Sequence, residues 1–375
     1  MKFIIMPDSF KGTISSQRIC QIVSDSISEL FPDSQIISIP IADGGEGTVE
    51  AFLARGGERR EVRVSGPFFK HVDSFYGEMG DTAIIEMAAC ASLPMVGNNK
   101  DPLFTTTYGV GELIRHALDG GARHIILGLG GSCTNDGGCG MAAALGVQFL
   151  DRDGNLFIPT GGTLRDISRL DASKVDSRIL GNLTVMCDIE NPLYGTNGAA
   201  YVFAPQKGAS PEQVVFLDDG LRHLAKVILS CTGTDVSSIP GGGAAGGMGA
   251  GAAAFLGGKL TPGIDVVLQS ADFVHQLKDA TCVITGEGSC DSQSLMGKAL
   301  SGIAKHTRSA GVPLIVLAGG TKGDPQAFYD AGVTAIVPCT RRPMPFTELA
   351  PLAEEFLTHS ITDALRLIRL GMSLK

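Results

Sequence analysis

The sequence predicts an α/β protein in which a parallel-sheet domain is interrupted by a second, mixed α/β domain. Near both ends of the chain, short apolar segments alternate with helical segments, which is the pattern of a parallel sheet with right-handed crossovers. This pattern changes at Arg59, where predicted strands are separated only by a loop and a hairpin. The length of 375 residues is enough for two domains with separate cores.

The amino-terminal segment begins the parallel pattern. Residues 1–6 form an apolar run that is too short for a signal-peptide core, so they predict a first strand. Ser15 and Ser16 can cap a helix, because the apolar residues that follow have helical spacing. Residues 35–41 predict a second strand, and another helix begins at Val49.

The middle of the chain supplies the inserted domain. Strands are expected at residues 61–64, 84–87, 125–127 and 183–187. A helix with apolar residues from Val110 to Leu118 on one face precedes the third of these strands. That strand runs into a glycine-rich loop at residues 128–138, and the last strand is followed directly by Asp188 and Glu190.

The carboxyl-terminal segment returns to the parallel pattern. Strands are expected at 282–284, 312–317 and 334–337, and helices at 299–305 and over most of 349–370. We therefore expect one discontinuous domain made of residues 1–60 and 265–375, and an inserted domain of residues 61–264. The active site is expected in a cleft between them.

Composition excludes several classes of function. A net charge of −9 without a basic block argues against binding to nucleic acid or to an acidic membrane surface. No stretch approaches the length of a transmembrane helix. The nine cysteines are scattered without a C-x-x-C pair, and Cys20, Cys187 and Cys282 lie in apolar runs, which favours a reducing, cytoplasmic environment.

Loops after the predicted strands contain small residues beside carboxylates or a lysine. Glycine-rich turns offer backbone N–H groups to phosphate oxygens, carboxylates hold Mg²⁺ or accept a proton, and lysines neutralise transferred charge. Taken singly, each residue has a simpler explanation as a helix cap, a turn residue or a solvated lysine. Together they favour phosphoryl transfer. The groups are Asp8, Ser9 and Lys11; Asp43 and Glu46; Asn135 and Asp136; Asp188 and Glu190; and Glu287, Asp291 and Lys298.

Common nucleotide and hydrolase motifs are missing. The sequence has no G-x-x-x-x-G-K-[ST] and no G-x-S-x-G. Gly241, Gly243 and Gly246 match G-x-G-x-x-G, but no apolar strand precedes them. A nicotinamide-dependent hydroxy-acid oxidoreductase therefore lacks its fingerprint, and a non-catalytic sugar-acid sensor lacks a recognisable DNA-binding module.

Seven segments occur in order along nearly the whole chain: residues 7–12, 43–48, 130–138, 188–193, 205–209, 243–247 and 285–298. These segments resemble the successive motifs of bacterial class I glycerate kinases. The resemblance implies a Rossmann-like domain interrupted by a second α/β domain. It also implies ATP- and Mg²⁺-dependent phosphorylation of D-glycerate to 2-phosphoglycerate in a cytosolic route that disposes of glyoxylate or sugar diacids. Glycerate 3-kinase activity is the alternative.

One position departs from the family pattern. A basic residue usually follows Thr-Gly-Glu-Gly, whereas this chain has Ser289. Either this loop grips phosphate less strongly, or Lys298 supplies the positive charge alone.

Chemistry suggests a role for each candidate residue. Ser9 and Lys11, with Asp8 and Glu46 beside the substrate, are candidates for binding glycerate. Asp188 is the candidate catalytic base and Asp43 its competitor, while Lys298 is a candidate for stabilising the transferring phosphoryl group. Glu287 and Asp291 are candidates for holding Mg²⁺. The remaining candidates, for cradling nucleotide phosphates or equally for binding glycerate, are Gly130, Gly131, Ser132, Asn135 and Asp136.

Overall fold

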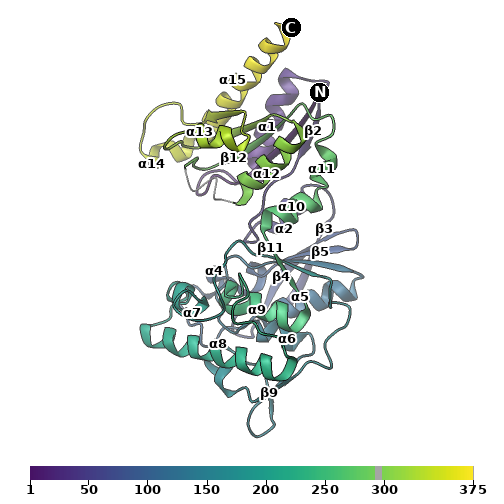
Figure 1. Cartoon of the computed structure of the whole chain (residues 1–375), viewed down its shortest axis with the longest axis vertical. Helices are drawn as coiled ribbons and strands as arrows, with labels where there is room; N and C mark the ends of the chain where they lie inside the picture. Colours follow the sequence, from purple (N-terminus) through teal and green to yellow (C-terminus); the bar gives the residue numbers. More distant parts are fainter. Residues whose placement is uncertain (292–297, 375) are drawn as a thin grey trace. The chain divides into compact units, whose positions relative to one another are not determined.

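The computed structural model describes residues 1–291 and 298–374, without the side chain of Lys298. The chain divides into two compact units, Met1–Ala42 with Gly263–Lys375, and Asp43–Pro262 (Figure 1). Residues 43–60, which we expected in the first unit, lie in the second because α2 (Thr48–Leu53) packs on β4 (His71–Met79) and β5 (Thr82–Glu86).

The first unit contains a parallel sheet with the order β14-β13-β12-β1-β2. Every neighbouring pair of strands is parallel, which confirms the expected sheet type. The strands are β1 (Lys2–Pro7), β2 (Gln35–Ser38), β12 (Cys282–Glu287), β13 (Leu314–Ala318) and β14 (Ala335–Pro338). The longer helices are α1 (Ser16–Leu30), α10 (Gly263–Ser270), α12 (Lys298–Ala310) and α15 (Ala353–Ser373), and the shorter ones are α11 (Phe273–Gln276), α13 (Gln326–Ala331), α14 (Phe346–Leu349) and η3 (Ala350–Leu352).

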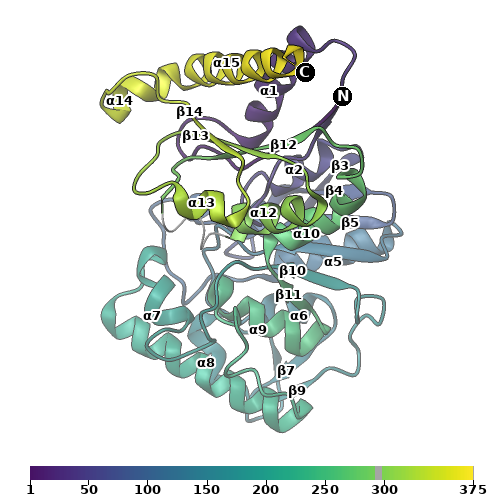
Figure 2. The same cartoon turned by 45° about the horizontal axis from the view of Figure 1, so that its top comes forward.

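Helices cover both faces of this sheet. Phe3 and Ile5 are buried in a cluster with residues of α1 and α15, whereas Ile4, between them, points to the opposite face. Figure 2 shows α1 and α15 on one side of the sheet and α12 and α13 on the other. The Ser15 hydroxyl accepts a hydrogen bond from the Arg18 N–H at 3.2 Å, so the expected cap of α1 is present. Such a sheet leaves the carboxyl ends of its strands for a site.

The second unit contains a mixed sheet with the order β11-β10-β6-β5-β4-β3. The pairs β3–β4 and β4–β5 are antiparallel, and the other pairs are parallel. The remaining strands are β3 (Glu58–Ser65), β6 (His124–Gly128), β10 (Leu183–Met186), β11 (Lys259–Thr261) and, in a separate antiparallel sheet, β7 (Gln148–Leu150), β8 (Leu156–Phe157) and β9 (Arg169–Asp171). The helices after α2 are α3 (Ala88–Ala91), α4 (Leu93–Val96), α5 (Tyr108–Asp119), α6 (Cys139–Ala144), η1 (Gly161–Asp166), α7 (Ala199–Phe203), η2 (Pro205–Lys207), α8 (Pro211–Thr232) and α9 (Ala244–Leu256).

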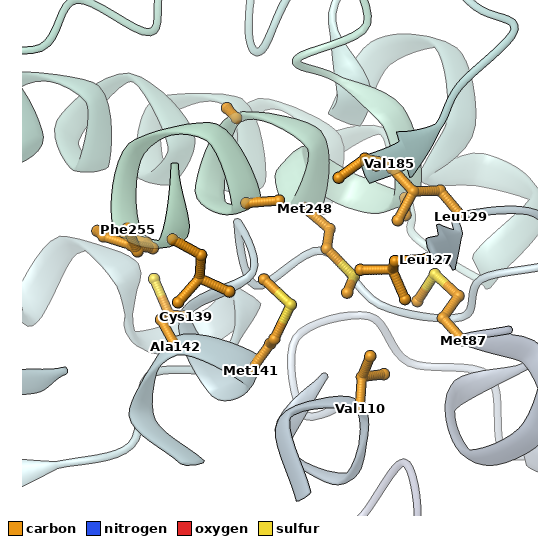
Figure 3. Packing of buried hydrophobic residues seen from close by; sticks show 14 of the residues in the cluster. Met87, Val110, Leu127, Leu129, Cys139, Met141, Ala142, Val185, Met248 and Phe255 are labelled. Carbon is orange, nitrogen blue, oxygen red and sulfur yellow. The ribbon is translucent and has the colours of Figure 1, made fainter. Parts of the chain in front are cut away.

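The core of the second unit forms where helices pack on the parallel part of its sheet. Met248 of α9 lies between Met141 of α6 and Leu127 of β6 (Figure 3), and all three are buried. Phe255 of α9 meets the ring of Phe149 edge-on, with ring centroids 5.6 Å apart. This packing fixes β6 and the loop that follows it.

Two further expectations, on membrane-spanning helices and on the cysteines, can be compared with the described part of the chain. Among its helices, none combines the length and the apolar composition of a membrane span. Cys20, Cys187 and Cys282 are buried, as expected for small core residues.

Candidate active site

Several predicted residues of the first unit lie together where β1 and β12 end. The two strands are parallel neighbours, with Pro7 paired to Gly286, and the Asp8 N–H donates to the Gly286 carbonyl at 3.0 Å. The Asp8 carboxylate in turn accepts the Ser9 N–H at 2.6 Å. Pairing of these strands therefore brings Asp8 and Ser9 beside Glu287 at the carboxyl edge.

The carboxylate of Glu287 lies in a strongly acidic surrounding. Burial raises the pKa of Glu287 to about 7, and the negative charges of Asp8 and Asp291 raise it further, while the Lys11 cation opposes them. Glu287 therefore lies close enough to interact electrostatically with Asp8, Lys11 and Asp291. A divalent cation would relieve this repulsion, so the donor set suits Mg²⁺, which usually takes only one or two protein carboxylates. In the described residues, no group of three or more His, Cys, Asp or Glu side chains could hold a metal ion.

The loop after β12 is tied to the end of β13. The Gly319 N–H donates to the Glu287 carbonyl at 2.9 Å, and the Cys290 N–H donates to the Gly320 carbonyl at 2.8 Å. Ser289, at the position that departs from the family pattern, is exposed. Lys298 is the first residue of α12, but its side chain lies outside the described residues, so its predicted role stays a prediction.

In the second unit, the loop that carries Asp43 packs over the ends of β6 and β10. A Cβ on Gly44 would lie 3.2 Å from Cβ of Met186 and 3.4 Å from Cα of Gly128, the last residues of these strands. Gly44 has a φ of +83°, which glycine tolerates. The Asp43 carboxylate accepts the Gly45 N–H at 2.9 Å, and Asp43 and Glu46 are both exposed.

The glycine-rich loop after β6 is pinned on two sides. The Gly130 N–H donates to the Gly44 carbonyl at 2.9 Å. Across the loop, Gly131 accepts from the Leu93 N–H at 2.9 Å and the Cys133 N–H donates to Ala91 at 3.0 Å. By contrast, the N–H groups of Gly131 and Ser132 donate to no residue in the described ranges, so they are available to a ligand.

Asp136, predicted to bind nucleotide, is fully buried, and its carboxylate holds the loop itself. It accepts hydrogen bonds from the Thr107 N–H at 2.8 Å, the Thr107 hydroxyl at 2.9 Å, the Gly138 N–H at 3.1 Å and the Gly140 N–H at 3.3 Å. Burial raises the pKa of Asp136, and these hydrogen bonds oppose the shift. With its oxygens so used, Asp136 can affect a ligand by shaping the loop.

Asn135 has a different environment, although it is the neighbouring residue and is also fully buried. Within residues 1–291 and 298–374, neither Oδ1 nor Nδ2 of its side chain has a hydrogen-bond partner. An unsatisfied buried polar group costs on the order of 1–3 kcal/mol. Such groups mark places where a bound molecule or an ordered water completes the hydrogen bonding.

Lys207 is a functional candidate to which the sequence analysis gave no role. It is buried at 2% exposure, and its Nζ donates to the Ser132 hydroxyl at 2.8 Å and to the Thr134 carbonyl at 2.7 Å. Burial lowers the pKa of Lys207 to about 8, while Cys133 and Asp136 act in the opposite direction. The signal was present in the segment Pro205-Gln206-Lys207-Gly208, which belongs to the resemblance to glycerate kinases.

Glu86 is a second residue that the sequence analysis missed. It ends β5, is buried, and accepts the Val49 N–H at 3.1 Å. Burial raises the pKa of Glu86 to about 7, and hydrogen bonds from the start of α2 counteract this. The one feature of the sequence that could have pointed to Glu86 is its single carboxylate directly after the apolar residues 83–85.

Asp188 lies two residues beyond the end of β10, the strand that neighbours β6. Its side chain is exposed, as is that of Glu190. The second unit thus brings Asp188, the Asp43 loop and the Gly130–Ser132 turn to one edge of its sheet. This is the edge at which open α/β sheets hold their ligands.

Comparison with known proteins decides the family. The model of the glycerate kinase family matches residues 3–369. The chain belongs to the glycerate kinase family. Within this family it is 45% identical over 341 residues to the glycerate 2-kinase of Escherichia coli K12, covering 90% of both chains. It is 43% identical over 360 residues to a glycerate kinase of Bacillus cereus, covering 95% of this chain and 94% of the relative.

Structural comparison agrees with this membership. A crystal structure of a protein from Salmonella typhimurium LT2 matches with a TM-score of 0.89 and 40% identity. The match covers 100% of this chain and 99% of the Salmonella chain. The expected α/β class with a parallel sheet and a mixed sheet is therefore confirmed.

Proposed function

We propose that this glycerate kinase family member transfers the γ-phosphoryl group of ATP to the 2-hydroxyl of D-glycerate. The observation that supports this most directly is family membership over residues 3–369. The 2-hydroxyl is favoured because the E. coli relative is named a glycerate 2-kinase. A cytoplasmic role in disposing of glyoxylate or sugar diacids completes the proposal.

Each sheet edge contributes a different part of the reaction. In the first unit, Lys11 and Ser9 bind the glycerate carboxylate, and Glu287 and Asp291 hold Mg²⁺. When bound with ATP, Mg²⁺ neutralises charge on the phosphate oxygens. Lys298 stabilises the transferring phosphoryl group. Clustering of Asp8, Lys11 and Asp291 around Glu287 supports this assignment.

The second unit supplies the base and the oxyanion donors. Asp188 accepts the proton of the attacking hydroxyl, and Asp43 is its competitor. The N–H groups of Gly131 and Ser132, which have no acceptor among the described residues, donate to oxygens of an anionic substrate. Positioning and electrostatic stabilisation account for most of the catalysis of phosphoryl transfer, so such preorganised donors suit the reaction.

The activity is tested by a coupled assay of ADP release with ATP, Mg²⁺ and D-glycerate, followed by phosphorus NMR of the product. We expect glycerate-dependent ADP release and a 2-phosphoglycerate signal. A 3-phosphoglycerate signal would support the kinase activity but show that the 3-hydroxyl, and not the 2-hydroxyl, is phosphorylated. If D-glycerate, L-glycerate, tartronate and glyoxylate all failed to release ADP, the proposal would be wrong.

A further inference from the structure

We propose that Lys207 is a positioning residue that acts through Ser132, turning the Ser132 hydroxyl and the adjoining N–H groups into an oxyanion site for one of the two substrates. This inference rests on the proposed kinase function. The recognised chemistry is an anionic oxygen, which belongs either to a phosphate of ATP or to the carboxylate of glycerate. The experiment below distinguishes these sources.

The geometry places a buried cation directly against a half-exposed hydroxyl. Lys207 is 2% exposed, whereas Ser132 is half-buried and Gly131 is exposed. The Ser132 oxygen accepts a hydrogen bond from Lys207 Nζ at 2.8 Å. Because that oxygen acts as acceptor, the Ser132 O–H is left to donate, and it has no acceptor in the described residues. A cationic donor strengthens the next hydrogen bond of the chain.

The same turn provides further donors. The N–H groups of Gly131 and Ser132 have no acceptor in the described part of the chain. A hydroxyl and two successive N–H groups in one turn make a suitable concave site for an anion. The pinning of Gly131 and Cys133 by residues 91–93 keeps these donors in place before a ligand arrives.

Asn135 is independent evidence that the loop is incomplete without a further molecule. Both polar atoms of its buried side chain lack partners among the residues that the structure describes. Its neighbour Thr134 accepts the second hydrogen bond of Lys207, at 2.7 Å. The buried lysine therefore contacts the same short segment, residues 132–135, that carries the unsatisfied amide.

Charges around Lys207 determine how pH affects this site. The groups that interact with the ammonium are Cys133 and Asp136, and burial raises the pKa of the Cys133 thiol to about 12. The thiol therefore stays neutral, and Asp136 is the only neighbouring carboxylate found among the described residues. As pH rises through about 8, Lys207 loses its proton and the oxyanion site loses its positive charge.

The test measures kcat and the KM of each substrate for wild type, Lys207→Met, Ser132→Ala and the double variant. We expect Lys207→Met to raise the KM for one substrate about tenfold or more while the KM for the other changes little. In the Ser132→Ala background, the same substitution should change that KM by less than about threefold. The affected substrate identifies the source of the anion, and thermal shifts with ATP or D-glycerate alone provide a readout without turnover.

The pH profile separates this role from mere structural support. In wild type, the KM that Lys207→Met raises should itself rise up to about tenfold per pH unit above pH ~8. This rise at high pH should be absent from both single variants. Ser132→Ala alters a half-exposed side chain, so it keeps the proposal testable if Lys207→Met fails to fold. Equal effects on both KM values, additive effects in the double variant, or an unchanged pH limb in Ser132→Ala would overturn the inference. Failure of the kinase function itself would instead appear as wild type without ADP release.

Discussion

The carboxylate of Glu86, at the end of β5, accepts a hydrogen bond from the backbone N–H of Val49, in the first turn of α2, at 3.1 Å. This contact ties the strand end to the helix that follows the Asp43 loop. Because Glu86 is buried at 2% exposure, the ionised carboxylate depends for solvation on this N–H group and on the backbone of Gly47 and Thr48. The position of the Asp43 loop is thus coupled to the charge of Glu86.

Stability should therefore depend on pH through Glu86. Its pKa is raised to about 7 in the folded chain, whereas an unfolded Glu titrates near pH ~4.3. Between these values the folded state binds more protons than the unfolded state, so the free energy of unfolding falls as pH rises. Glu86→Gln removes this titration. We expect wild type to lose about 2 kcal/mol relative to Glu86→Gln between pH ~5 and pH ~8, measured by urea unfolding.

Glu287→Gln is the matched comparison for this experiment, because the pKa of Glu287 is also raised to about 7. Glu287→Gln should remove the part of the pH dependence of the free energy of unfolding that comes from Glu287. If wild type and Glu86→Gln kept parallel stability curves across this range, the pKa of Glu86 would not be raised in the folded protein.

Replacing Asp136 should damage folding more than ligand binding. Asp136→Ala removes the acceptor of hydrogen bonds from Thr107, Gly138 and Gly140. Buried donors would then lack partners, and we expect a loss of about 3–5 kcal/mol in the free energy of unfolding. Asp136→Asn retains one acceptor oxygen and should lose less. A variant that unfolded at the wild-type denaturant concentration but no longer bound ATP would instead show direct contact with nucleotide.

The close packing of the two glycine loops predicts a strong steric effect at Gly128. A Cβ there would overlap the backbone of Gly44, which has no flexible side chain to move aside. We expect Gly128→Ala to lower the free energy of unfolding by about 1–3 kcal/mol and to displace the Asp43 loop. Gly371→Ala is the control, because no atom of another described residue is found within 4 Å of its Cβ position. Equal thermal midpoints for both variants would contradict this packing.

Apolar periodicity and loop composition predicted the parallel sheet and the residues at its carboxyl edge. Asp8 and Glu287 could be placed there because each follows a short apolar strand. The chemical environment of a residue could not be predicted in this way. Asp136 and Asn135 are adjacent and equally buried, yet the Asp136 carboxylate accepts several hydrogen bonds and the Asn135 side chain has no partner in the described part of the chain.

That difference depends on groups distant in sequence, and so does the role of Lys207. Asp136 is satisfied by Thr107, and Lys207 reaches back to Ser132. The sequence around each residue does not reveal such contacts with residues far away in the chain. The position of α2 was also misplaced for this reason, because its packing partners β4 and β5 follow it in the chain and β4 was not recognised.

Protons should compete with Mg²⁺ at Glu287. A carboxylate must be ionised to hold the cation, and the pKa of Glu287 is raised to about 7 by burial and by Asp8. Below pH ~7 we therefore expect the apparent Mg²⁺ affinity to fall by up to about tenfold per pH unit. Glu287→Gln should weaken Mg²⁺ binding and flatten this dependence. Calorimetric titration with Mg²⁺ and ATP measures both effects, and an unchanged Glu287→Gln titration would remove Glu287 from the metal site.

Asp188 and Asp43 can be distinguished as catalytic bases by matched amide substitutions. Asp43 accepts the Gly45 N–H at 2.9 Å, and the Oδ1 of an asparagine can still accept it. Asp43→Asn therefore removes charge and basicity while retaining the loop hydrogen bond. If Asp188 is the base, Asp188→Asn should lower kcat about 100-fold or more with little change in KM, whereas Asp43→Asn should keep most of kcat. The reverse pattern would assign the proton to Asp43, and near-normal kcat in both variants would exclude a carboxylate base at either position.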